Sequence, residues 1–185
     1  NALASEQGSS VSSTERGDAH SSATVHSDTA HPLVRRNDNQ HLYQSIEHHQ
    51  RQLDTLEAAH PGLRDTFRQK DREAAQAHHD HERALKNNQV TQAHIDNKRH
   101  TADERRRAHG RLTENEYMQD YHRNTILGHS ETIQSSHKLA QMSEPYTNGP
   151  QLAQDILQHD ANARAAYASA SVAHHNAEHS RANQY

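Results

Sequence analysis

The sequence predicts an all-α protein, an antiparallel helical hairpin or slim helical bundle with coiled-coil-like seams and a disordered N-terminal tail. Apolar residues recur every three or four positions over long stretches, which places them on one face of an α-helix. No stretch alternates apolar and polar residues as a half-buried strand does. Leu, Ile, Val and Phe are scarce, which suits thin helical assemblies that need little core per residue.

The clearest periodicity lies in residues 38–86. Pro61 lacks a backbone donor and its ring clashes with the carbonyl of Glu57, and Gly62 is a second helix breaker. We therefore expect an antiparallel hairpin that turns at Pro61-Gly62, rather than one kinked helix. The stripe that would form its seam consists of Leu42, Ile46, His49, Leu53, Leu56, Leu63, Phe67, Lys70, Ala74, Ala77, His81 and Ala84.

The rest of the chain divides by composition. Residues 1–36 are rich in Ser, Thr, Ala and Gly without periodicity, which predicts a flexible tail before a helical domain over 37–185. Asn87-Asn88 predicts a break, and polar helices should follow over 89–142. We expect helix starts at Thr101 and Thr113, each with a Glu three residues later, and helix ends at Gly110 and Gly128.

Residues 143–150, with the sequence S-E-P-Y-T-N-G-P, predict the strongest loop of the chain. A C-terminal helix should follow over 151–180, because Pro150 suits a first helical position. Its expected stripe consists of Leu152, Ile156, His159, Ala163, Tyr167 and Ala170.

One short pattern has a counterpart elsewhere. Leu42-Tyr43 followed by Leu53-Asp54, with His31-Pro32 upstream, resembles the opening helix of the conserved domain on bacterial type IV secreted killing effectors. The gap after His31-Pro32 is longer here, and the rest of the family pattern does not follow, so we carry no function over. The Ser-rich start is also common in proteins handed to bacterial secretion machines, which favours a secreted or extracytoplasmic location. No signal peptide opens the sequence, and no apolar run predicts a transmembrane segment.

Several function classes lack their motifs. The absence of cysteine excludes thiol nucleophiles, disulfides and Cys-ligated metals. There is no G-x-S-x-G elbow and no Gly-rich phosphate loop, so we expect no enzyme. The basic run Arg105–Arg107 follows Asp103-Glu104 in a net acidic chain, which argues against specific nucleic-acid binding. Tyr117, Met118 and Tyr121 form either part of the scarce core or a contact surface.

The chain contains 20 histidines. Histidines three or four residues apart share a helix face and could present two ligands to zinc, nickel or copper. A metal site normally needs a third or fourth protein ligand, which favours ordinary surface histidines over a dedicated metal site. The candidate metal ligands are His78, His81, Glu82, His175, Glu178 and His179.

These observations predict a non-enzymatic helical protein, either a protein–protein interaction module or a structural assembly subunit, for example a secreted bacterial factor. Its partner would be another protein or a second copy, and it would need no cofactor. The alternative is a histidine-rich protein that binds or buffers zinc, nickel or copper. Either way, His49 and His81 lie in the seam, where burial disfavours protonation, so mild acid should loosen the helices.

Overall fold

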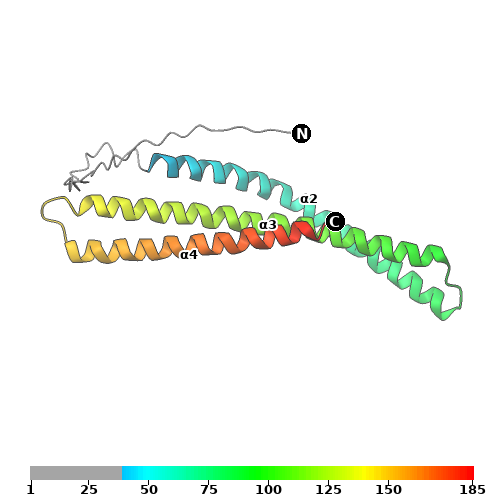
Figure 1. The fold of residues 1–185 in the computed structure, drawn as a ribbon. Helices are drawn as coiled ribbons and strands as arrows, with labels where there is room; N and C mark the ends of the chain where they lie inside the picture. The colour runs from blue at the N-terminus through cyan, green and yellow to red at the C-terminus, as the bar shows by residue number, and fades with distance from the viewer. Residues whose placement is uncertain (1–38) are drawn as a thin grey trace, which may run out of the picture. The chain divides into compact units, whose positions relative to one another are not determined.

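The structure, a computed structural model, describes residues 39–185 and places three helices in that part of the chain. They are α2 (Gln40–Lys86), α3 (Gln92–Gln141) and α4 (Gly149–Ala182). Short connections make consecutive helices antiparallel (Figure 1). The predicted all-α bundle of antiparallel helices is confirmed, whereas the predicted tail over residues 1–36 lies outside the described residues.

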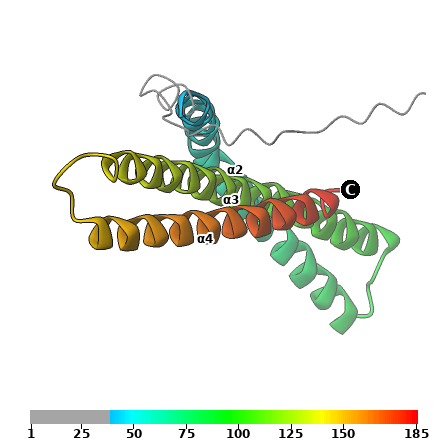
Figure 2. The ribbon, with the colours of Figure 1, turned by 60° about the vertical axis from the view of Figure 1, so that its left-hand side comes forward.

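α3 is the central helix. It packs against both α2 and α4, while α2 and α4 do not pack against each other (Figure 2). The first part of α3 has α2 alone as its neighbour, as the contact of Lys70 with Glu104 illustrates. From Glu114, which pairs with Arg181, α4 lies along the other side of α3. The second half of α3 therefore packs against α2 on one side and against α4 on the other.

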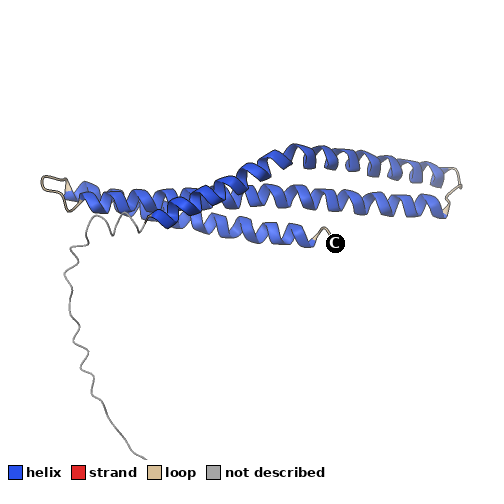
Figure 3. Cartoon of the chain, turned by 90° about the horizontal axis from the view of Figure 1, so that it is seen from above, coloured by secondary structure: helices blue, strands red, loops and turns tan. Residues whose placement is uncertain are grey.

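The predicted turn at Pro61-Gly62 is wrong, because α2 continues through both residues. Every position of the predicted stripe is buried or half-buried, so the stripe itself is confirmed as the face that packs on α3. Figure 3 shows that α2 bends along its length and crosses α3. Proline inside a helix costs about 3 kcal/mol, and the contacts of one continuous face compensate for this local cost. The hairpin lies instead between α2 and α3.

The connection between α2 and α3 is where Asn87-Asn88 predicts a break. Asn88 adopts a φ of 52°, a left-handed conformation that Asn tolerates better than most residues. Thr91 then caps α3: its hydroxyl accepts from the backbone N–H of His94, and the His94 ring accepts from the Thr91 N–H. His94 thus takes the place that Glu or Gln holds in a usual capping box.

The predicted loop before the last helix is also confirmed. Residues 142–148 connect α3 to α4, and Tyr146 has a φ of 67°. The side chain of Asn148 accepts from the backbone N–H of Gln151, and Pro150 stands in the first turn as expected. The predicted stripe of this helix is buried or half-buried throughout.

The predicted helix ends at Gly110 and Gly128 are wrong, since α3 is uninterrupted. Both glycines are buried because α4 comes very close to them. A Cβ atom on Gly128 would lie 2.6 to 2.9 Å from ring atoms of Tyr167, and one on Gly110 would lie 3.0 Å from the carbonyl oxygen of Ser180. These glycines therefore permit helix contact rather than end a helix.

The predicted helix starts at Thr101 and Thr113 are wrong for a related reason. Both threonines lie inside α3, and their hydroxyls donate to carbonyls one turn earlier, at Asn97 and His109. A threonine whose hydroxyl donates to a carbonyl of its own helix can lie in the interior of that helix, so these two residues do not mark helix starts.

The core of the described helices is small. Among the described residues no large side chain is fully buried. α4 contributes alanines at steps of three and four, which allow it to lie close to α3, and α3 contributes mainly polar side chains. The buried apolar residues are Leu53, Ala77, Ala84, Ala108, Leu112, Ile133, Leu152, Ala163, Ala166, Ala170, Ala173 and Ala177. The buried polar residues of α3 are Thr101, Asn115, Gln119, His122, Thr125 and Ser135.

None of these three helices is both long and apolar enough to cross a membrane. That agrees with the absence of a predicted transmembrane segment.

Replacing Gly128 with alanine should destabilise the protein. The added methyl group meets the Tyr167 ring, and overpacking of this kind costs about 1–3 kcal/mol, more than the gain of about 1 kcal/mol in helix propensity. Gly62→Ala is the matched control, because nothing lies within 4 Å of its Cβ position, so it should stabilise the protein. Urea unfolding followed by circular dichroism measures both. Equal stabilisation by the two variants would show that α4 does not lie against Gly128.

Candidate functional site

Two histidines meet where the first half of α2 crosses α3. His49 from α2 and His122 from α3 approach with their Nδ1 atoms 2.7 Å apart. Such a contact is a hydrogen bond only when one Nδ1 carries a proton and the other does not. Protonation of both rings would leave two donors facing each other. The pair therefore joins α2 to α3 only while at least one ring is neutral.

His129 extends this contact to the third helix. Its Nε2 lies 2.9 Å from the hydroxyl of Ser45 on α2, and its Nδ1 lies 2.7 Å from the hydroxyl of Tyr167 on α4. Tyr167 occupies the space that Gly128 leaves open. One imidazole on α3 thus connects both neighbouring helices, which do not pack against each other.

An open groove lies over these residues. It has a volume of about 530 Å³ and is bounded by all three helices. Tyr121 lines it, with its ring centroid 5.7 Å from that of His49 and 5.2 Å from that of His174. We call this the histidine groove. Its lining residues are His49, Tyr121, Thr125, His129, Tyr167, Ala170, Ser171 and His174.

The histidines of this region favour their neutral forms. Burial lowers the pKa of His49, His122 and His129, and the nearby histidines lower it further. The effect is largest at His122, whose pKa falls from 6.5 to about 4. Among the described residues, none of the three has a carboxylate within ion-pair distance. The lowered pKa of His49 agrees with its predicted place in the seam.

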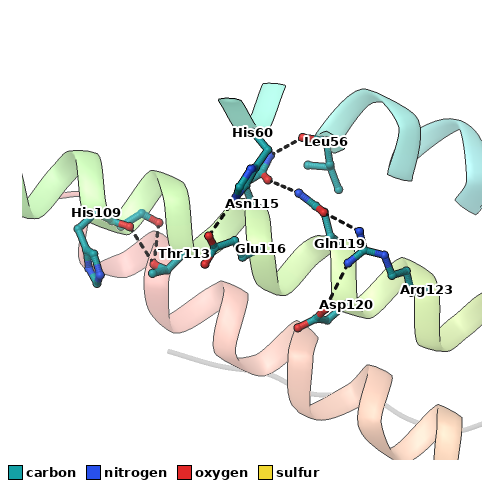
Figure 4. Close-up of polar contacts among 10 residues, drawn as sticks. Leu56, His60, His109, Thr113, Asn115, Glu116, Gln119, Asp120 and Arg123 are labelled. Atoms are coloured by element: carbon teal, nitrogen blue, oxygen red, sulfur yellow. Dashed lines mark hydrogen bonds and ion pairs between the residues drawn. The ribbon is translucent and has the colours of Figure 1, made fainter. Parts of the chain in front are cut away.

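A second polar cluster on α3 lies against Leu56 and His60 of α2 (Figure 4), in the turn that precedes Pro61. The Asn115 amide donates to the carbonyl of Leu56 at 3.0 Å, and Gln119 donates to Asn115 at 2.7 Å. Arg123 then donates to both Gln119 and Glu57. The carbonyl of Glu57 is the one that Pro61 leaves without its helical donor. Polar side chains of α3 therefore hold α2 where its own backbone is weakest.

The structure does not bring the predicted metal ligands together into larger groups. In the described part of the chain, no three His, Asp or Glu side chains are arranged to hold a metal ion. On α2, His78 is exposed and His81 is half-buried, with its Nδ1 3.7 Å from Glu82. On α4, three candidates remain on the exposed surface: His175, Glu178 and His179. Same-helix pairs thus stay without a third ligand, and metal binding by them remains a prediction.

The aromatic group predicted on α3 divides between core and groove. Tyr117 and Met118 are half-buried, and Tyr121 lines the histidine groove. In the basic run, Arg105 pairs with Asp71 and lies over the ring of Phe67, while Arg106 pairs with Asp103. Two of its three arginines are therefore engaged within the molecule.

Comparison with known proteins adds no assignment, because no family model, curated protein or solved structure matches this chain. The site is therefore interpreted from its own geometry.

Mild acid should destabilise the bundle through these histidines. A histidine whose pKa is lower in the folded protein than in the unfolded chain stabilises the folded protein, because it is more easily kept neutral there. This contribution is complete above the unfolded pKa of about 6.5 and is lost as the pH falls through the folded pKa. For His122 the loss should develop between pH 6.5 and about 4, and we expect it to be on the order of 1–3 kcal/mol. Urea unfolding at a series of pH values measures it.

His122→Gln removes the titrating group and should flatten this profile. The exposed His137 provides the control, since His137→Gln should leave the profile unchanged. If wild type and His122→Gln lose stability equally on acidification, His122 is not kept neutral by burial.

Proposed function

We propose that this chain is a non-enzymatic helical module that associates with another protein or with further copies of itself. The observation that carries the proposal is the outer face of α4, which exposes apolar side chains although apolar residues are scarce in the chain. Leu157 is 66% exposed and Val172 is 61% exposed. In a chain with so small a core, apolar residues on an unpacked helix face favour a partner.

α4 carries apolar residues on two sides. Its buried alanines, from Ala163 to Ala177, face α3. A second set of apolar residues lies on the exposed side of α4. Its members are separated by four, four, three and four residues, which also places them on one helix face. A helix that is apolar all round is usually covered on all sides. The exposed set consists of Leu157, Ala161, Ala165, Ala168 and Val172.

The same face is poor in charge. Arg164 is the single charged residue between Asp160 and Glu178, counting histidine as neutral. Beside Val172, an open groove of about 370 Å³ extends onto α3, where Tyr117, Asn124 and one charged residue, Asp120, line it. Depletion of charge together with aromatic residues is typical of the centre of a protein–protein interface.

Within residues 39–185, an arrangement that resembles a catalytic site supports the same conclusion. Ser45 and His129 are within hydrogen-bond distance, as a nucleophile and its base would be. The other nitrogen of His129 meets the phenol of Tyr167 where a hydrolase would place a carboxylate. Ser45 also lies inside α2, where backbone N–H groups are used by the helix and cannot form an oxyanion hole. We therefore interpret this contact as a helix-to-helix link.

Charge placed on the α4 face should weaken association. We expect the protein to form oligomers by light scattering or sedimentation, and Val172→Glu or Leu157→Glu to weaken them at least about tenfold, roughly 1.4 kcal/mol. Leu85→Glu is the control, since Leu85 is 47% exposed but lies at the end of α2. Circular dichroism verifies that each variant is folded.

A folded chain that stays monomeric at all concentrations would contradict self-association. Catalytic turnover by that monomer would contradict the proposal as a whole.

A further inference from the structure

We propose that the histidine groove binds a small oxyanion, such as a phosphate, sulfate or carboxylate group, when His49 and His129 are protonated. This site lies apart from the outer face of α4 and does not depend on the association proposed for that face.

The groove exists because of how the three helices pack. α2 and α4 each lie on α3 and leave the angle between them open. The resulting space of about 530 Å³ is open to solvent and has walls from all three helices. His49 contributes from α2, His129 from α3 and His174 from α4, so a ligand there would contact every helix of the described bundle.

The lining supplies hydrogen-bond donors and no carboxylate. A protonated imidazole has two N–H donors, and at His129 both face hydroxyls, those of Ser45 and Tyr167, so that protonation frees the Tyr167 hydroxyl to donate into the groove. Tyr121 and Ser171 add further hydroxyls, whereas the Thr125 hydroxyl already donates to the carbonyl of Tyr121. Hydrogen bonds from charged donors to an oxyanion are about twice as strong as those between neutral groups. The chemistry of the lining is thus suited to an anion rather than to a metal cation.

The charged groups around the groove also favour an anion over a cation. On α2, His41 and His48 lie near enough to His129 and His49 to disfavour further positive charge there. On α4, Glu178 lies 3.8 Å from His174 and is the acidic group in contact with the lining. Protonation inside the groove therefore creates positive charge with little compensation from the protein.

Histidines elsewhere in the same bundle show the contrast. His60 is paired with Glu116, and His159 is paired with Glu131. Those two histidines have a carboxylate to accept their proton charge. His49 and His129 have each other and neutral hydroxyls. An external oxyanion would therefore take the role that Glu116 and Glu131 play at the other sites.

Proton uptake and anion binding must then favour each other. An anion that binds the protonated groove raises the affinity of its histidines for protons, and by reciprocity protonation raises the affinity for the anion. Binding should be weak at pH 8 and should strengthen as the pH falls.

Sulfate is the probe of choice, because it keeps its double charge throughout this pH range. We expect calorimetry at fixed chloride concentration to give sulfate binding at least about tenfold tighter at pH 5.5 than at pH 8, since hydrogen bonds to charged groups contribute more than neutral ones. In NMR titrations sulfate should shift the ring signals of His49, His129 and His174 first. Uniform shifts of all histidines would overturn the proposal, as would affinity that does not change with pH.

Two matched variants locate the site. His174 is exposed on the rim, so His174→Gln should fold normally and lower the sulfate affinity at pH 5.5 about tenfold. His137 is an exposed histidine of α3 outside the groove, so His137→Gln should leave the affinity unchanged. Equal loss in both variants would show that sulfate responds only to the total charge of the protein.

Discussion

The structure depends on the packing of α3 between two helices with very few large apolar side chains. Where a richer sequence would place leucines, α3 buries Asn115, Gln119 and His122. Each of these makes a hydrogen bond within the bundle, which avoids the cost of an unsatisfied buried polar group. The helices are therefore joined by directional contacts, and the scarce apolar surface is supplemented by close approach at Gly110 and Gly128.

This polar interior also explains how α2 passes through Pro61. A proline in the middle of a helix removes one backbone hydrogen bond, and the stretch around it needs support from a neighbour. Asn115 donates to the Leu56 carbonyl, and Arg123 holds the side chain of Glu57. Contacts with α3 thus help to stabilise α2 around Pro61. The same reasoning makes the histidine contacts sensitive to protonation, because a directional contact can be lost with a single proton.

The sequence predicted the inward faces of α2 and α4, but it predicted neither the inward face of α3 nor where every helix ends. The stripes from Leu42 to Ala84 and from Leu152 to Ala170 depend only on helical spacing, and they lie where they were expected. Pro61, Gly110 and Gly128 are local breaker signals, and contacts with other helices override them. Asn87-Asn88 and residues 143–150 do end helices, because several turn-forming residues act together there.

The histidine groove was the harder part to foresee. Of its histidines, His49 was placed in the seam, but its link to His122 and His129 was not predicted. Helical spacing relates residues on one helix, whereas these contacts join three. One signal was present in the sequence: Asn115, His122 and His129 recur every seven residues, the spacing of a seam. Which helix that seam faces depends on tertiary packing, which local spacing does not specify.

The most direct test of this account is the distance between spin labels at residues 44 and 79, measured by pulsed electron resonance. Gln44 and His79 are exposed and lie at equal separations from Pro61-Gly62, and the chain has no native cysteine to interfere with labelling. A continuous α2 held along α3 places them about 50 Å apart at 1.5 Å per residue, somewhat less with the bend. A turn at Pro61-Gly62 would bring them within roughly 10–20 Å, as neighbours in a helical hairpin. A distance near 50 Å is the result the account predicts, and the short distance would contradict it.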